Sequence, residues 1–207
     1  MTAKIKLNSA SGGGSVSIQA PSSSSNNRVI SLPDIADGTL LTSQSSLDST
    51  KLSPAISAGI SMVDQWSITT DNNKTNGQVI DTGWERSDYN FAQIGTGMTE
   101  SSGIFTFPQT GIYFIMSQHA MNTSASYAGV NHRVSSDSGS SYSTVSYGQI
   151  TNTNNGYHQM SLHSVVDVQN ASTYRFGLRA YNTANVQYSG DSNALRNGVT
   201  FIRLGDT

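Results

Sequence analysis

The chain has 207 residues, a length that suits one medium-sized domain plus an appended segment. Only 12% of the residues are charged, the formal net charge is -2 and the basic residues are scattered, so we expect neither nucleic-acid binding nor attraction to an anionic membrane. The absence of cysteine excludes disulfides and thiolate metal sites, and no apolar run approaches the roughly 18 residues of a membrane span.

Residues 1–60 form an arm that is rich in Ser and Gly, with short apolar stretches between the polar ones. Alternation of polar and apolar residues predicts three short strands, at residues 4–7, 15–18 and 28–32. Residues 1–10 lack the apolar core of a signal peptide, so we expect synthesis in a cytosol without export. The arm has too few apolar residues to offset its own ordering entropy, so we expect it to dock on other copies of the chain or on another protein.

A linker joins this arm to the rest of the chain. Its apolar residues fit either a short stem around a symmetry axis or an irregular connection: Leu47, Leu52, Ile56 and Ile60. Pro54 argues against one unbroken helix here. We place the domain boundary between residues 60 and 61.

Residues 61–207, the head, have the texture of a β-sandwich, with turn signals about every ten residues. The predicted strands are 62–69, 79–81, 91–94, 103–107, 112–121, 128–135, 142–150, 159–168, 174–181, 186–188 and 199–204. Ser164 is the only polar residue on a strand face that otherwise contains Met160, Leu162, Val166 and Val168. The head is therefore expected to be all-β.

The titratable residues offer no assembled catalytic or metal site. His158 and His163 are five residues apart, so on a strand they point to opposite faces. His119 and His132 belong to different predicted strands, and we expect these histidines at the surface or at an interface. Asp137 alone is insufficient for calcium and suits a turn. We therefore expect no cofactor, no metal ion and no enzymatic activity.

Tyrosines provide the candidate recognition residues. Tyr142 and Tyr147 lie among the Ser, Thr, Asn and Gly residues of positions 138–156, around the predicted strand at 142–150, and Tyr157 follows this region directly. Tyrosine beside small polar residues is typical of binding loops, where it provides rigid contact area. The alternative is that these side chains pack the sandwich or a subunit interface.

Residues 95–115 resemble the signature of the C1q and tumour-necrosis-factor (TNF)-like superfamily. Phe105, Gly111 and Tyr113 match its aromatic, glycine and aromatic positions, and Gly111 would permit close backbone approach. The other matching positions, in the signature and in the first and last strands, are Phe107, Trp66 and Phe201. Ile115 and Ser117 depart from the pattern because the family usually has aromatic residues at these positions. The resemblance implies a ten-stranded jelly roll that forms homotrimers.

The arm has a resemblance of its own. Residues 4–10, 12–16 and 18–21 look like the opening of tail-fibre and other virion proteins of marine phages, and residues 32–42 look like the phrase that closes this segment in them. The two resemblances together imply a trimeric particle appendage that contacts other virion proteins through residues 1–42. It would be made in the bacterial cytosol and carried on the virion surface.

Two versions of this hypothesis stay open. The head of a tail fibre would bind a host-surface glycan or protein, whereas a capsid decoration or cement protein would clamp neighbouring subunits. The alternatives from other classes are a free C1q-like lectin or ligand, and a carbohydrate-degrading spike.

Overall fold

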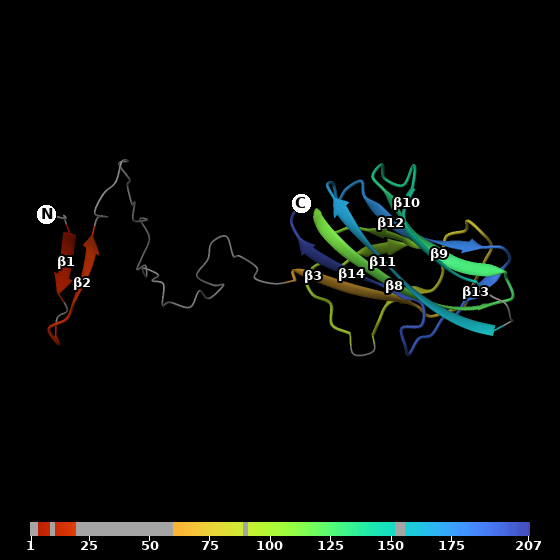
Figure 1. Ribbon diagram of the computed structural model, residues 1–207, viewed down its shortest axis with the longest axis horizontal. Helices are drawn as coiled ribbons and strands as arrows, with labels where there is room; N and C mark the ends of the chain where they lie inside the picture. Colours follow the sequence, from red (N-terminus) through yellow and green to blue (C-terminus); the bar gives the residue numbers. More distant parts are fainter. Residues whose placement is uncertain (1–3, 9–10, 20–59, 89–90, 152–155) are drawn as a thin grey trace. The chain divides into compact units, whose positions relative to one another are not determined.

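The computed structural model describes residues 4–8, 11–19, 60–88, 91–151 and 156–207 (Figure 1). The chain divides into two compact units, Met1–Leu47 and Asp48–Thr207. The predicted strand at residues 28–32, the closing phrase at 32–42 and the linker from Leu47 to Ile56 lie outside the described residues. The predicted boundary at residues 60 and 61 stays a prediction.

The described part of the first unit is a β-hairpin. Strands β1 (Lys4–Asn8) and β2 (Ser15–Gln19) pair antiparallel, as their alternating sequences predicted. Gly12 and Gly13 in the turn have φ angles of 88° and 69°, which glycine adopts without strain. Ile5 and Leu7 are 65% and 60% exposed, so the hairpin carries an uncovered apolar surface.

The second unit is a sandwich of two antiparallel sheets (Figure 1). In order, the first sheet contains β4 (Asn72–Lys74), β13 (Val186–Tyr188), β8 (Gly111–Thr123), β14 (Gly198–Gly205), β3 (Met62–Ile68) and β5 (Trp84–Arg86), with β11 (Gly156–Val168) also paired to β8. The second sheet contains β10 (Ser143–Thr151), β9 (Tyr127–Ser135), β12 (Arg175–Asn182), β7 (Ile104–Thr106) and β6 (Thr99–Ser101). Strand β8 is central because β11 pairs along its whole length on one side and β14 and β13 pair with it on the other.

The described residues contain no helix, and therefore none with the length and hydropathy that a bilayer crossing needs. This all-β structure confirms the predicted fold class. Most of the long strands agree with the sequence prediction to within a few residues. Residues 79–81 and 91–94 are exceptions, because only isolated bridges form there, Val79 to Arg179 and Ile94 to Val63. The short strands β4, β5 and β6 were not predicted.

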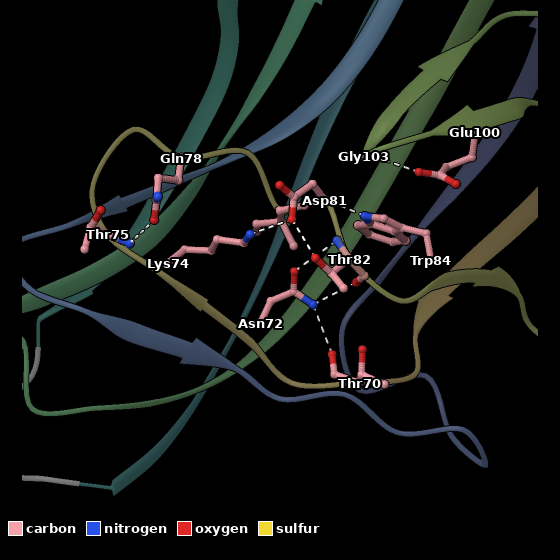
Figure 2. Close-up of polar contacts among 11 residues, drawn as sticks. Thr70, Asn72, Lys74, Thr75, Gln78, Asp81, Thr82, Trp84, Glu100 and Gly103 are labelled. Carbon is pink, nitrogen blue, oxygen red and sulfur yellow. Dashed lines mark hydrogen bonds and ion pairs between the residues drawn. The ribbon is translucent and has the colours of Figure 1, made fainter.

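The segment between β4 and β5 is held by polar side chains rather than by a long ladder (Figure 2). The buried side-chain amide of Asn72 donates to the carbonyl oxygens of Thr70 and Thr82 at 3.0 and 2.8 Å, and it accepts from the backbone N–H of Thr82. Lys74 and Asp81 form an ion pair at 2.5 Å across the same segment. The Asn72 bonds satisfy backbone groups of Thr70 and Thr82, while the backbone N–H of Ile80 donates to the carbonyl oxygen of Leu178.

One buried charge lies in the core beside the tryptophan of β3. The carboxylate of Asp64, 0% exposed, accepts from Trp66 Nε1 at 2.9 Å and from the backbone N–H of Met98 at 2.7 Å. Arg86 donates to both carboxylate oxygens at 3.1 and 3.2 Å, and its guanidinium lies 4.5 Å from the Trp66 ring centre. The negative charge of Asp64 is thus compensated by the guanidinium of Arg86 and by the two N–H groups that donate to it.

Candidate functional site

The aromatic residues of the signature lie inside the sandwich. Phe105 of β7 is fully buried, and its ring centroid lies 5.6 Å from that of Trp66 and 5.2 Å from that of Phe201. Phe107 follows β7, and its ring lies 4.8 Å from Tyr113 of β8. Edge-on and tilted contacts of this kind stabilise a core beyond the area that they bury. In one copy of the chain these residues therefore hold the two sheets together.

Gly111 begins β8 where the backbone passes close to the end of β14. Its φ is 138°, and a Cβ placed there would lie 2.4 Å from the carbonyl oxygen of Gly205. No larger residue fits this approach without a shift of the backbone. The loop before it is closed by the Tyr113 hydroxyl, which donates to the carbonyl oxygen of Gln109 at 2.9 Å.

Two of the four histidines are buried, which corrects the expectation of surface or interface positions. His119 of β8 and His132 of β9 are 1% and 0% exposed. Burial lowers the pKa of His119 to about 4, and burial together with the nearby histidines lowers the pKa of His132 to about 3. Both rings are therefore neutral at pH 7. His163 is exposed on β11, as expected.

The two buried histidines belong to a chain of hydrogen bonds that crosses between the sheets. His119 Nδ1 lies 3.1 Å from Asn197 Oδ1, and His119 Nε2 lies 2.9 Å from Ser117 Oγ. Ser117 Oγ lies 2.7 Å from His132 Nε2, and His132 Nδ1 lies 2.9 Å from Ser164 Oγ. We call these five residues the polar chain.

Ser117 and His132 have the separation of a nucleophile and its general base. Both are closed to solvent, however, so a substrate cannot reach the hydroxyl. The second ring nitrogen of His132 faces the hydroxyl of Ser164, where a catalytic triad would place a carboxylate. We therefore assign the pair to the core.

Asp137 lies in a turn, as the sequence indicated. Its carboxylate accepts from the hydroxyl groups of Ser135 and Ser141, both at 2.6 Å. These bonds lower the pKa of Asp137 to about 2. Among the described residues, no three His, Cys, Asp or Glu side chains gather in a way that could hold a metal ion.

The outer face of the first sheet carries an unbroken row of apolar residues. Strand pairing places Val165 opposite Phe114, Phe114 opposite Ile202, Ile202 opposite Val63, and Val63 opposite Ile94. Val165 is 62% exposed and Ile94 is 46% exposed, while the three residues between them are partly exposed. We call these five residues the apolar row. Such a continuous exposed row is typical of an interaction surface.

The three candidate tyrosines lie on or beside strands, which agrees with the predicted strand at residues 142–150 and corrects only the loop placement of Tyr157. Tyr142 precedes β10, Tyr147 lies on β10 and Tyr157 lies on β11. Tyr147 and Tyr157 are 65% and 66% exposed, so neither packs the core of this subunit. Tyr142 packs against Arg133, whose guanidinium lies 5.3 Å from the ring centre. The structure does not bring the three together into one site.

A polar hollow of about 270 Å³ lies over β8 and β11. It is lined by Gln118, His119, Gln159, Met160, Ser161 and Arg196. The Arg196 guanidinium lies 5.8 Å from the ring centre of Tyr157. The sequence did not single out this hollow, because its residues come from three separate segments.

No family model matches the chain, and no curated protein matches its sequence. Its fold is similar to that of Eiger TNF from S. frugiperda, with a TM-score of 0.55 and 14% identity over 70% of this chain and 94% of that one. It is also similar to murine APRIL at pH 8.5, with a TM-score of 0.52 and 15% identity over 69% of this chain and 98% of that one. The head is therefore a TNF-like jelly roll, which confirms the fold that its signature implied, although its two sheets contain 12 strands, β3 to β14, rather than ten.

Proposed function

We propose that the chain is a non-enzymatic structural protein of a bacteriophage particle. Three copies form an appendage, the arm attaches it to other virion proteins, and the head faces outward from the virion surface. The likeness of residues 4–21 to marine-phage virion proteins supports the phage origin. The exposed side chains of Ile5 and Leu7 on the β1–β2 hairpin support docking of the arm onto another protein.

The apolar row is the observation that carries the trimer. It crosses four strands and the bridge at Ile94 without a charged residue in it, so further copies of the chain could cover it without burying an unpaired charge. Closed three-fold symmetry is typical of this jelly roll and would give each copy the same cover. The arms of a trimer would then make several weak contacts at once with the particle.

The attachment partner divides the proposal into two versions. The likeness of the arm to tail-fibre proteins favours a fibre, whose head would bind a glycan or protein on the host surface. A capsid decoration protein would use the same arm and the base of the head to stabilise neighbouring subunits. A free C1q-like lectin or ligand is the second candidate, which the exposed Tyr147 and Tyr157 favour.

Light scattering of the purified full-length chain tests the trimer. We expect three times the chain mass of 22.0 kDa. Val165→Glu places three charges in the trimer contact and should give monomers, because Val165 belongs to the apolar row. Gln149→Glu, an exposed position on the other sheet, is the matched control and should stay trimeric. A wild-type monomer, or a trimeric Val165→Glu variant, would contradict this interface.

Immunogold labelling of purified particles tests the virion role separately. Antibody against the head should label the tail tip of a fibre-bearing particle or the whole shell of a decorated capsid. Particles that carry no label would remove the phage proposal and leave the free lectin or ligand, whatever the oligomeric state.

A further inference from the structure

The outward side of the second sheet combines tyrosines with arginines. Three adjacent strands, β9, β10 and β12, contribute to it, and alternation along each strand turns these side chains away from the core. We call this surface the tyrosine–arginine face: it consists of Tyr127, Arg133, Tyr147, Arg175, Arg179 and Tyr181. The sequence does not show it as a cluster, because its members are spread along the chain from Tyr127 to Tyr181.

The aromatic part of this face is a group of three rings. The ring centroid of Tyr181 lies 5.2 Å from that of Tyr127 and 6.0 Å from that of Tyr147. Gly129 lies opposite Tyr181 in the sheet and adds no side chain between the rings. A Cβ there would lie 2.0 Å from the carbonyl oxygen of Gly148. Gly129 is itself buried, so the accessible surface here belongs to the tyrosine rings, against which a flat apolar surface can stack.

The basic part of the face has no acidic partner among the described residues. Arg133 donates to the carbonyl oxygen of Tyr142 at 2.6 Å, and Arg175 donates to those of Tyr174 and Ser172. The described structure gives the guanidinium of Arg179 no hydrogen bond. By contrast, Lys74, Arg86 and Arg203 each form an ion pair with an aspartate.

The positive charge of the face is consequently not neutralised. The pKa of Arg133 is lowered first by burial and then by the positive charge of Arg179. The negative charge of Asp137 acts on the hydroxyl of Tyr142 at one end of the face. The carboxylate oxygens of Asp137, however, already accept hydrogen bonds from Ser135 and Ser141. An anion bound beside Arg133 and Arg179 would relieve their mutual repulsion.

Two buried atoms at the centre of the face also lack partners. Asn131 Oδ1 and Arg133 Nε have no hydrogen bond in the described structure. Strand pairing places Asn131 between Tyr147 and Arg179. Buried polar atoms in proteins are usually paired, and two of the four unpaired buried side-chain atoms of the described residues belong to this face.

We infer that the tyrosine–arginine face binds a carboxylated polysaccharide. The tyrosines stack against sugar rings, and the arginine forks pair with the carboxylates. Arg175 and Arg179 are four residues apart on one strand, or about 13 Å, which suits charges repeated along a polymer better than one compact ion. Three arginines are few for nucleic acid, whose affinity depends on many phosphate contacts. This inference rests on the proposed outward-facing head.

Calorimetry with the full-length chain and a galacturonate oligosaccharide tests the inference. Its methyl ester is the matched ligand, because it keeps the sugar rings and lacks the charge. We expect binding of the acid and not of the ester. Arg179→Gln should weaken binding at least about tenfold, since hydrogen bonds between charged groups contribute that much. Arg196→Gln removes an arginine over the other sheet and should bind as the wild type does.

Tyr147 provides a second test that leaves all charges in place. Tyr147→Ser should weaken binding by roughly fivefold, as expected for loss of an aromatic contact, while Tyr147→Phe should retain it. Equal binding of the acid and the ester, or unchanged binding by Arg179→Gln, would overturn the inference. So would binding only to a sulfated polymer or to DNA. Light scattering of the same samples separates the two proposals: a trimer without binding removes this inference alone, and a binding monomer removes only the trimer.

Discussion

Ser117 Oγ and His132 Nε2 lie 2.7 Å apart and connect the two sheets through the interior of the sandwich. The direction of every bond in the polar chain follows from its end at Asn197. The amide nitrogen of Asn197 donates to the carbonyl oxygens of Ala120 and Ser189, so its Oδ1 is free to accept from His119 Nδ1. Ser117 must then donate to His119 Nε2 and accept from His132 Nε2. The bonds that Ser117 donates to His119 Nε2 and Ser164 donates to His132 Nδ1 therefore each require a neutral imidazole.

Acid should destabilise the head because protonation breaks this order. The pKa values of His119 and His132 in the folded chain, about 4 and about 3, lie below the unfolded value of about 6.5. Their stabilising contribution is complete above pH 6.5 and is lost as the pH falls towards 4 and 3. At pH 5 the loss is on the order of 2 kcal/mol for each ring. Urea unfolding at pH 7 and pH 5 measures it. Ser161→Ala, on the exposed side of β11, should leave the difference unchanged, and equal stability at both pH values would contradict the prediction.

Ser117→Ala removes the hydroxyl that serves both histidines. His132 then has a buried N–H without an acceptor, and His119 has a ring nitrogen without a donor. We expect a loss of about 2–4 kcal/mol in the free energy of unfolding. Ser161→Ala, on the exposed side of β11, is the control and should change it little. Similar effects of the two substitutions in urea unfolding would show that the polar chain does not stabilise the fold.

Asp64→Ala leaves the indole N–H of Trp66 and the backbone N–H of Met98 without their acceptor, and it removes the partner of Arg86. We expect a loss of about 3 kcal/mol, since breaking a buried pair leaves groups uncompensated. Asp167→Ala removes an exposed carboxylate on β11 and is the matched control. Thermal unfolding of the two variants should differ clearly, and a melting temperature for Asp64→Ala equal to that of the control would be inconsistent with this role.

Gly111→Ala and Gly205→Ala form a matched pair at one backbone contact. A Cβ at Gly111 lies 2.4 Å from the carbonyl oxygen of Gly205, whereas a Cβ at Gly205 meets nothing within 4 Å. We expect Gly111→Ala to destabilise the head by about 2 kcal/mol or more, because it adds strain at positive φ to a clash. Gly205→Ala should be near neutral. Chemical denaturation of both variants checks this, and the reverse ranking would refute it.

The long strands were predictable because alternation on β8, β9, β11 and β12 reports their burial directly. The short strands were not: Asn72–Lys74 contains no apolar residue, and its position depends on side-chain bonds to residues 70 and 82 that no periodicity reveals. Residues 79–81 looked like a strand because Val79 and Ile80 are apolar. In the structure Ile80 is buried at a loop instead.

The polar chain was visible in the sequence as polar residues on otherwise apolar strand faces, but we expected its histidines at the surface or at an interface. Ser117 and His119 share the inward face of β8 with Tyr113 and Ile115, and Ser164 interrupts the apolar face of β11. A polar residue in such a position is either a break in the pattern or a buried partner. Which partner it meets depends on how the sheets stack, and one sequence does not encode that visibly. The apolar row and the tyrosine–arginine face were missed for the same reason.

The chain enters and leaves the head at the same end of the sandwich, since Met62 pairs with Arg203 and Arg203 also donates to the Ser61 hydroxyl at 3.3 Å. A protein fused after Thr207 would therefore emerge beside the incoming strand. Peptides to be displayed away from that end belong in the loops at the opposite ends of β3 and β14, where residues 69–71 and 191–196 lie. Both chain connections of the head thus lie at one end of the sandwich, and the opposite end is the place for inserted peptides.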